Sequence, residues 1–266
     1  MTPTAAGMKS DLLSGKHAVV TGGTRGIGAA VTRVLLDHGA RVTVLGRSTE
    51  LQPGGALDFK RSSDLAYAKA DVGDPAAVAH AFESARARSG PIDILVNNAG
   101  QAVSAPFLKT DATLWRRMMT VNLDGAFHCI QAALPGMLSA GWGRIINMAS
   151  TAGLTGYAYV TAYCASKHAV VGLTRALALE VATKSVTVNA VCPGFTNTDL
   201  LKESVANIVA KTGRTPEEAR AELASRNPQK RLVQPEEVAN AVAWLCLPGS
   251  EAVTGQTIAV AGGEVM

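Results

Sequence analysis

The sequence predicts an α/β fold in which a doubly wound parallel sheet forms a single domain. Short, mostly apolar runs rich in β-branched residues alternate with longer helical stretches along the chain. Their apolar character suits strands that are covered on both faces, as in parallel sheets. The chain has 266 residues, of which 47% are hydrophobic. It contains no internal repeat and no linker, so this length is enough for one large domain with a buried core.

The expected elements alternate along the chain in the order that such a sheet needs. Strands are expected at residues 17–21, 41–45, 66–70, 92–97, 144–148, 186–192 and 257–260. Helices are expected at residues 26–38, 75–88, 113–139, 159–183 and 235–247. Asp74 precedes Pro75, which predicts an N-cap followed by proline at the first helical position.

Two segments lie outside this alternation. Residues 1–13 are expected to form a flexible N-terminal arm, which leaves residues 14–266 as a single catalytic domain. Residues 199–231 are polar and helical in tendency, and they follow the sixth expected strand. Ligands of open α/β sheets bind beyond the carboxyl ends of the strands, so we expect this segment to be a helical substrate lid.

Composition argues against several classes of protein. The 25 Lys and Arg against 21 Asp and Glu are scattered, which argues against a nucleic-acid partner. Apolar stretches stay short of the roughly 18 residues that span a membrane, and the N-terminus lacks the apolar core of a signal peptide. The four cysteines have no metal-like spacing, so we expect no metal, buried free thiols and a cytoplasmic location.

A glycine-rich turn, residues 21–28 (TGGTRGIG), joins the first expected strand to the first helix. Glycine permits positive φ and close approach of a ligand, and a helix N-terminus attracts phosphate. The spacing GxxxGxG differs from the common GxGxxG dinucleotide fingerprint, and a tight turn without a ligand is the alternative. The expected contacts to a dinucleotide are Gly22, Thr24, Arg25, Gly26, Ile27 and Gly28.

The end of the second expected strand indicates which dinucleotide is bound. An acidic residue there would bind a free ribose 2′-hydroxyl, but the sequence has Gly46 and Arg47. Arg47, with Arg25 as a second partner, can pair with a 2′-phosphate, because guanidinium matches phosphate oxygens bidentately. This favours NADP(H) over NAD(H). A solvated surface charge is the alternative for either arginine.

The catalytic candidates follow later strands. Tyr163 and Lys167 are four residues apart and share one face of a helix. Ser150 follows the fifth expected strand, and Asn122 lies in an expected helix. The segment Asn97–Asn98–Ala99–Gly100 ends the fourth expected strand, where the backbone must pass close to a bound cofactor.

Together these residues resemble the short-chain dehydrogenase/reductase family, from Gly15 to Gly263. The matching elements are residues 21–28, Asp71–Val72, residues 97–100, Asn122, Ser150, Tyr163 with Lys167, Pro193–Gly194 and Thr198. Within the family, residues 187–195 (TVNAVCPGF) and 227–233 (NPQKRLV) are most similar to 3-oxoacyl-thioester reductases and polyketide ketoreductases. The resemblance implies a Rossmann-like fold.

The resemblance also implies roles for individual residues. Tyr163 would be the general acid in reduction, Ser150 would bind the substrate oxygen, and Lys167 would bind the nicotinamide ribose and lower the pKa of the tyrosine. Asn122 would hold a water that links Lys167 to solvent. The remaining cofactor contacts would be Asp71 and Val72 at the adenine, Asn98, Ala99, Gly100, Pro193 and Gly194 along the dinucleotide, and Thr198 at the carboxamide.

The expected substrate is a medium-sized ketone or a 3-oxoacyl thioester. Its expected contacts are Ser150, Leu154, Tyr157, Tyr163 and Phe195, with Gln101–Val103 and Tyr159 also lining the pocket. A secondary alcohol or hydroxyacyl-CoA dehydrogenase is the alternative. A non-catalytic dinucleotide sensor is disfavoured because serine, tyrosine and lysine are all present, and a nucleotide-sugar epimerase because the glycine spacing differs.

The resemblance further implies a homotetramer that packs through its two long helices. Relatives of the 3-oxoacyl kind dock an acyl carrier protein on basic groups; Lys184 matches one such position, whereas Gly141 stands at another. A carrier protein, coenzyme A or neither therefore stays open. Lys202, Lys211, Lys230 and Arg231 could contact the phosphorylated carrier, with a solvated lid surface as the alternative.

Overall fold

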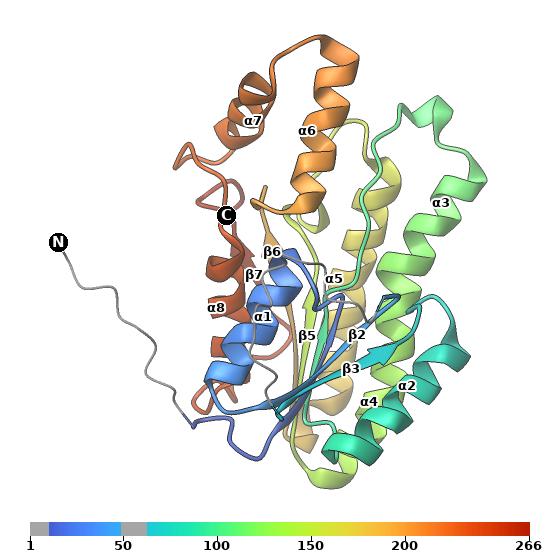
Figure 1. The fold of residues 1–266 in the computed structure, drawn as a ribbon, viewed down its shortest axis with the longest axis vertical. Helices are drawn as coiled ribbons and strands as arrows, with labels where there is room; N and C mark the ends of the chain where they lie inside the picture. Colours follow the sequence, from blue (N-terminus) through green and yellow to red (C-terminus); the bar gives the residue numbers. More distant parts are fainter. Residues whose placement is uncertain (1–10, 49–62) are drawn as a thin grey trace, which may run out of the picture.

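The computed structural model describes residues 11–48 and 63–266, and it contains the predicted doubly wound sheet (Figure 1). Seven strands pair in parallel in the order β3-β2-β1-β4-β5-β6-β7. They are β1 (His17–Thr21), β2 (Arg41–Gly46), β3 (Leu65–Lys69), β4 (Ile94–Asn97), β5 (Gly143–Met148), β6 (Val186–Pro193) and β7 (Thr257–Val260). The chain order reverses between β1 and β4, so the carboxyl ends of these two strands flank the crevice in which such sheets bind ligands.

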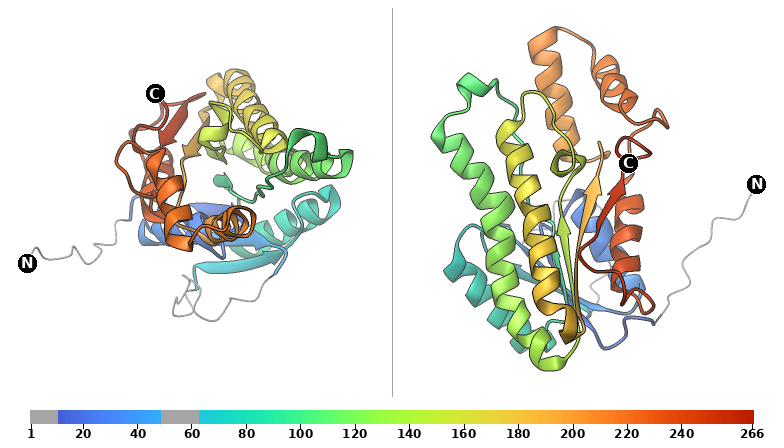
Figure 2. Two further views of the ribbon diagram at one scale, coloured as in Figure 1. Left: turned by 90° about the horizontal axis from the view of Figure 1, so that it is seen from above. Right: turned by 180° about the vertical axis from the view of Figure 1, so that it is seen from behind.

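Helices cover both faces of the sheet, as the apolar strands require (Figure 2). The helices α1 (Gly26–Asp37) and α8 (Pro235–Cys246) pack on one face. On the other face lie α2 (Pro75–Ser89), α4 (Gly125–Ala140) and α5 (Thr161–Val181). Asp74 caps α2 by accepting hydrogen bonds from the backbone of Ala76 and Ala77, as predicted.

The expected helix at residues 113–139 is divided into three parts. Helix α3 (Ala112–Met119) leads into a wider π-helical turn, Thr120–Asp124, before α4 begins. A π turn shifts the register of the following residues, and here it contains Asn122. The expected helix at 159–183 starts two residues later, because Tyr159 has a left-handed φ of 67°.

The predicted lid consists of α6 (Asp199–Thr212) and α7 (Pro216–Ser225), which stand beyond the carboxyl ends of the strands (Figure 1). The two helices share a small apolar core that is separate from those of the sheet. Its buried members are Leu201, Val205, Ala219 and Leu223. Phe195 packs against this core and so links the lid to the end of β6.

The start of the described chain and one of the four cysteines differ from the expectations. Leu13, the last residue of the expected arm, is buried, and its N–H donates to the carbonyl of His38; residues 1–10 of that arm lie outside the described residues. Cys129, Cys192 and Cys246 are buried free thiols, but Cys164 is partly exposed. In the described part of the chain, no helix is long and apolar enough to cross a membrane.

His17 in β1 is fully buried, and its ring is hydrogen-bonded to the carbonyl of Gly90 and to the Thr43 hydroxyl, both at 2.9 Å. Burial, assisted by the charge of Arg41, lowers the pKa of His17 below its ordinary value, while the Gly90 carbonyl opposes the shift. The folded protein therefore holds this imidazole neutral at a pH where the unfolded chain already binds a proton.

This burial predicts a pH-dependent stability. The contribution of the neutral His17 ring to the free energy of unfolding is complete above about pH 6.5, the approximate pKa of histidine in the unfolded chain. It is lost as the pH falls through the lower pKa that His17 has in the folded protein. Urea unfolding of the wild type should therefore show a loss of free energy between pH 7.5 and pH 5. The loss should be smaller in His17→Asn, and an equal loss in both proteins would contradict the assignment.

Candidate active site

The glycine turn between β1 and α1 has the backbone that close approach of a ligand requires. Gly22 and Gly26 have φ of 65° and 52°, in the left-handed region. Helix α1 has no side-chain cap at its N-terminus, so its first N–H groups stay available to an anion. Thr24 and Ile27, also predicted as contacts, lie in the same turn and are partly buried. The turn thus fits a bound pyrophosphate.

Gly28 is required here by packing. A Cβ at this position would lie 2.2 Å from the carbonyl oxygen of Gly22 and 2.5 Å from Asn98 Nδ2. We expect Gly28→Ala to lower the free energy of unfolding by about 1–3 kcal/mol. Gly136→Ala is the matched control, because nothing lies within 4 Å of its added Cβ on α4. Chemical denaturation of both variants tests this, and equal stabilities would refute it.

Thr21, the first residue of the glycine turn and not one of the expected cofactor contacts, ties the turn to the end of β4. The Thr21 hydroxyl accepts hydrogen bonds from the backbone N–H groups of Asn98 and Ala99, both at 2.9 Å. The Asn98 side chain donates to the carbonyls of Thr21 and Gly22. These bonds hold Asn98, Ala99 and Gly100 beside the glycine turn, where the sequence predicted a close backbone approach. A polar residue at the end of an apolar strand was the available signal.

The residues expected at the adenosine lie at the ends of β2 and β3. Gly46 ends β2, and Arg47 follows it as an exposed side chain. β2 is joined to the glycine turn by a 2.7 Å hydrogen bond from Gly22 N to the Leu45 carbonyl. Asp71 accepts a hydrogen bond from Gly73 N in the turn after β3. Its neighbour Val72 is buried against Gly125.

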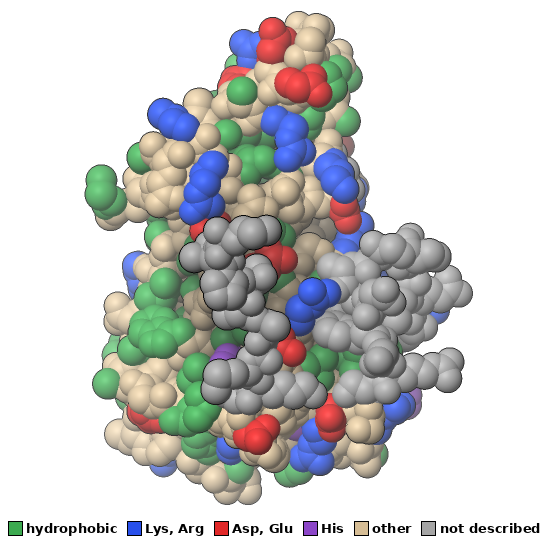
Figure 3. Space-filling view, turned by 60° about the vertical axis from the view of Figure 1, so that its left-hand side comes forward, with side chains coloured by type: hydrophobic (Ala, Val, Ile, Leu, Met, Phe, Trp, Pro, Cys, Tyr) green, Lys and Arg blue, Asp and Glu red, His purple; other side chains and the backbone are tan. Residues whose placement is uncertain are grey.

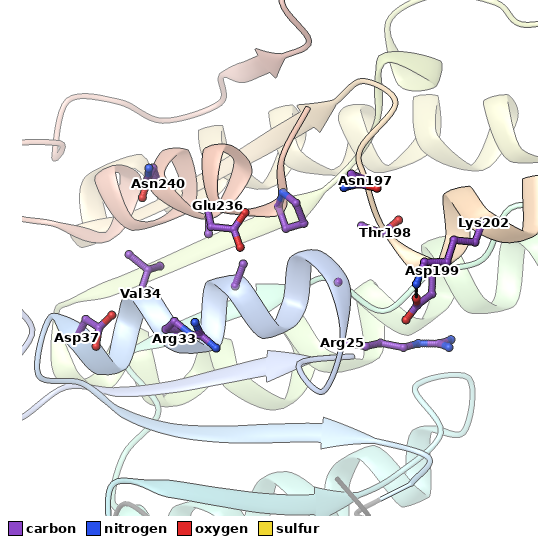
Figure 4. A pocket seen from close by; sticks show the side chains of 14 residues that line it. Arg25, Arg33, Val34, Asp37, Asn197, Thr198, Asp199, Lys202, Glu236 and Asn240 are labelled. Atoms are coloured by element: carbon purple, nitrogen blue, oxygen red, sulfur yellow. Dashed lines mark hydrogen bonds and ion pairs between the residues drawn. The ribbon is translucent and has the colours of Figure 1, made fainter. Parts of the chain in front are cut away.

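A cleft of about 470 Å³ lies between α1, α8 and the start of α6 (Figure 4). Three predicted cofactor residues line it: Arg25, Gly26 and Thr198. A hydrogen bond from Lys202 lowers the pKa of Asp199, and the charge of the exposed Arg25 adds a smaller effect in the same direction. Cations and anions are mixed in this cleft, and neither Tyr163 nor Lys167 is among its described lining residues.

The segment after β6 folds back over the glycine turn. Pro193 ends β6, and Gly194 N donates to the carbonyl of Val260 in β7. Thr198 is the N-cap residue of α6, and its side chain lies 3.2 Å from the position that a Cβ on Gly26 would take. The expected carboxamide contact and the expected pyrophosphate contact are therefore adjacent.

Tyr163 and Lys167 lie on one face of α5, as their spacing predicted. The Lys167 ammonium is 5.8 Å from the centre of the Tyr163 ring and donates a 2.7 Å hydrogen bond to the carbonyl of Met148, at the end of β5. Ser150 follows two residues later, where its hydroxyl accepts from Ala152 N and forms a hydrogen bond with Tyr163. Strand β5 and helix α5 thus bring all three side chains together.

The electrostatics of this group differ from the expectation. Burial raises the pKa of Tyr163 above its ordinary value, and the hydrogen bond with Ser150 opposes the rise. Burial also lowers the pKa of Lys167 to about 8. A lowered tyrosine pKa was expected, but in the protein chain by itself desolvation of the phenolate outweighs the hydrogen bond with Ser150.

Asn122 supports this group from the π turn. Its Oδ1 accepts a 2.9 Å hydrogen bond from Gln101 N, and its Nδ2 donates to the Gln101 carbonyl and to Ser166 Oγ, both at 3.0 Å. Ser166 Oγ donates in turn to the carbonyl of Tyr163. Asn122 therefore positions the loop after β4 and the tyrosine turn of α5 through direct contacts.

The expected substrate contacts have different surroundings. Leu154 is partly buried against an apolar cluster under α5, and the ring of Phe195 contacts that of Tyr157 edge-on. The Tyr157 hydroxyl lies 2.8 Å from Thr151 Oγ1 and 2.8 Å from Glu264 Oε1. Tyr159, expected in the pocket, is 64% exposed.

Glu264 was absent from the predicted site because its sequence position carries no motif. Burial, and to a smaller extent the nearby Glu264 carboxylate, raises the pKa of Tyr157 to about 12. The hydrogen bond with Thr151 and the charge of Arg226 oppose this shift.

Within the described residues, no group of three or more His, Cys, Asp or Glu could hold a metal ion.

The fold and the site together define a dinucleotide-dependent oxidoreductase. A glycine turn that fits a phosphate group lies at the first βα junction, and a tyrosine, a serine and a lysine converge at the neighbouring strand ends. A family model described as short chain dehydrogenase matches residues 16–208. The chain therefore belongs to the short-chain dehydrogenase family.

Individual relatives cover nearly the whole chain. A putative ketoacyl reductase of Streptomyces coelicolor is 40% identical over 92% of this chain and 95% of its own length. A D-beta-hydroxybutyrate dehydrogenase of Rhizobium meliloti is 35% identical over 93% of this chain and 98% of its own. A solved actinorhodin polyketide ketoreductase with NADPH matches with a TM-score of 0.89 and 37% identity, over 96% of this chain and 98% of that one.

Proposed function

We propose that this protein transfers hydride between NADPH and a ketone of medium size, and that a 3-oxoacyl thioester is the best-fitting substrate class. The observation that carries the proposal is the convergence of Ser150, Tyr163 and Lys167 at the carboxyl end of β5. The glycine turn and the Thr21 contacts provide a place for the dinucleotide beside them. The similar polyketide ketoreductase was solved with NADPH, which supports the choice of cofactor.

The chain's own residues would handle the proton while the cofactor supplies the hydride. Hydride addition to a carbonyl carbon leaves negative charge on the oxygen, which needs a proton and a second hydrogen-bond donor. Tyr163 would give the proton and Ser150 would hold the oxygen. Because burial raises the pKa of Tyr163, its phenol is protonated at neutral pH and ready to donate.

Lys167 would stabilise the phenolate that this donation leaves. A unit charge 5.8 Å away, the distance from the Lys167 ammonium to the centre of the Tyr163 ring, contributes about 3 kcal/mol in an effective dielectric near 20 before desolvation, which corresponds to roughly two pKa units. A pKa of about 8 leaves most of the Lys167 side chain charged at pH 7. Lys167 would also bind the nicotinamide ribose, and Asn122 would keep the tyrosine turn in place.

Arg47 and Arg25 support the preference for NADPH. Both side chains are exposed beside the glycine turn, where a ribose 2′-phosphate would lie, and Gly46 puts no carboxylate there. The other expected contacts are distributed along the same dinucleotide: Asp71 and Val72 near the adenine, residues 98–100 and 193–194 along the middle, and Thr198 at the carboxamide.

Reversing the charge at residue 47 should change the cofactor preference. Arg47→Asp is expected to weaken NADPH binding by about tenfold to a hundredfold, since it removes a charge-assisted hydrogen bond and adds repulsion. NADH binding should be unchanged or tighter. Fluorescence titration with both cofactors tests this, and an unaltered ratio of affinities would show that Arg47 faces solvent.

A substrate panel tests the reaction itself. Acetoacetyl thioesters, cyclic ketones and secondary alcohols would be offered in turn while NADPH absorbance is followed. Consumption of NADPH with the thioesters or ketones is the expected result. Turnover only with secondary alcohols and oxidised cofactor would favour the alternative, a secondary alcohol or hydroxyacyl-CoA dehydrogenase.

A carrier protein is the less supported form of the acyl substrate. Lys184 is exposed at one expected docking position, but Gly141 stands at the other. Lys and Arg side chains are scattered over the lid with acidic neighbours (Figure 3). Lys202 pairs with Asp199, and Arg231 pairs with Glu237. These contacts favour a solvated lid surface, which leaves coenzyme A or a free ketone as alternatives.

A cytoplasmic homotetramer is the proposed form of the protein. Large apolar side chains are exposed on α3, α4 and α5, which would pack against a neighbour: Trp115, Phe127, Leu138 and Leu179. Burying several such side chains, among them Leu179 at 82% exposure, would favour association. The four free cysteines suit a reducing compartment. Light scattering of the purified protein would give the oligomeric state, and a monomer would refute this proposal.

A further inference from the structure

The chain end after β7 brings a carboxylate to the substrate side of the site. Gly262 and Gly263 have φ of 60° and 91°, and a Cβ on Gly262 would lie 2.1 Å from Asn227 Oδ1. This close contact fixes the course of the segment along the end of the lid. Figure 1 shows the C-terminus at the level of the lid base, above the ends of β6 and β7. Glu264 is thereby directed toward the residues that follow β5 and β6.

One oxygen of Glu264 is bound through Tyr157. The Tyr157 hydroxyl lies 2.8 Å from both Glu264 Oε1 and Thr151 Oγ1, but a phenol has a single hydrogen to donate. The carboxylate is the stronger acceptor, so Tyr157 donates to Glu264 and accepts from the Thr151 hydroxyl. Thr151 directly follows Ser150. The Tyr157 hydroxyl therefore links the Glu264 carboxylate to Thr151, which is the neighbour of Ser150 in the chain. Ser150 is the residue expected to hold the substrate oxygen.

The second oxygen of Glu264 has no compensating contact. Oε2 is buried without a hydrogen-bond partner among the described residues, and it lies 2.9 Å from the position that a Cβ on Gly194 would take. No described cation forms an ion pair with Glu264. Arg226 stacks 5.2 Å from the centre of the Tyr157 ring, but its side chain is exposed, so solvent screens it. The Glu264 carboxylate thus lies beside Tyr157 and Gly194 without a paired cation among the described residues.

We propose that Glu264 is a specificity-determining residue of the substrate site, which excludes ketones that carry a free carboxylate near the carbonyl. The substrate then presents a neutral ester, thioester or hydrocarbon group on that side. The argument is electrostatic: a like charge at close range in a partly desolvated site is repelled without direct contact. This inference rests on the proposed function and narrows its substrate class.

Methyl acetoacetate and acetoacetate are the probe pair, because they share the reacting ketone and differ in charge. At pH 7 with NADPH, kcat/KM of the wild type is expected to be at least about fiftyfold higher for the ester. Glu264→Gln should raise kcat/KM for acetoacetate by about tenfold and change that for the ester by less than about threefold. Glu217→Gln, on the exposed face of α7, removes the same charge elsewhere and should leave both values unchanged.

A binding measurement separates this inference from the proposed function. Butyrate and butyramide, which have nearly the same shape, would be titrated calorimetrically into the protein saturated with NADP⁺. Glu264→Gln should bind butyrate at least about fivefold more tightly than the wild type does, with butyramide unchanged. Ketone turnover with an unchanged butyrate affinity and an unchanged ester preference would overturn the role of Glu264. No turnover with any ketone, but the expected butyrate shift, would overturn the proposed reaction instead.

Discussion

Tyr163→Phe is expected to lower kcat for ketone reduction by 10²- to 10⁴-fold, the usual contribution of a positioned general acid, or roughly 3–5 kcal/mol. The ring remains in place on α5, so packing is kept and only the proton donor is lost. The affinity for NADPH should change by less than about threefold, because the hydroxyl acts mainly in the transition state. Initial rates with a ketone substrate and a fluorescence titration with NADPH give the two values.

Tyr159→Phe is the matched control for this experiment. Tyr159 is an exposed tyrosine four residues earlier in the chain, with its side chain outside the group formed by Ser150, Tyr163 and Lys167. Loss of the hydroxyl in Tyr159→Phe should leave kcat for ketone reduction unchanged. Equal activity of Tyr163→Phe and the wild type would remove Tyr163 as the acid, and with it the mechanism proposed for this site.

Lys167→Met is expected to lower kcat/KM by about 10²- to 10³-fold, through loss of the charge that stabilises the phenolate. Unlike the Tyr163 variant, it should also weaken NADPH binding, because Lys167 would contact the ribose. The side chain is buried and donates to the Met148 carbonyl, so a methionine of similar length preserves much of the packing. Circular dichroism would verify the fold, and unchanged kinetics would contradict the role.

The pH profile of the wild type provides a second measure of Lys167. Burial lowers its pKa to about 8, so its charge is present below that pH and lost as the pH rises through it. We expect kcat/KM for reduction to fall above pH 8, since the neutral amine no longer supports proton transfer. A profile that stays flat up to pH 10 would show that the lysine charge does not contribute.

The order of elements could be predicted from the sequence because most strands are buried on both faces and are rich in apolar residues. Strands such as β1 and β6 are buried along their whole length, and the turns between elements contain recognisable caps such as Asp74. The motif residues were identifiable for a related reason, since glycine at Gly28 and the spacing of Tyr163 and Lys167 are local requirements. These features depend on near neighbours in the chain.

The π turn and Glu264 could not be predicted in this way. The π turn at Asn122 interrupts a segment whose helical periodicity looks continuous, because the hydrogen bonds to Gln101 and Ser166 are long-range. Tyr157 and Glu264 are 107 residues apart and meet only because β5, β6 and β7 end side by side. The direction of the tyrosine pKa shift also depends on burial, which spacing does not reveal.

By itself, then, the sequence determined the parallel sheet and the glycine turn, and it identified the residues that we propose move a proton and recognise a 2′-phosphate. Local residue types fix these features through backbone conformation and periodicity. Only the tertiary structure decided that Glu264 meets Tyr157 and how strongly Tyr163 and Lys167 are desolvated. Both depend on contacts between strand ends that are remote in the chain, and electrostatic energy depends on distance and burial.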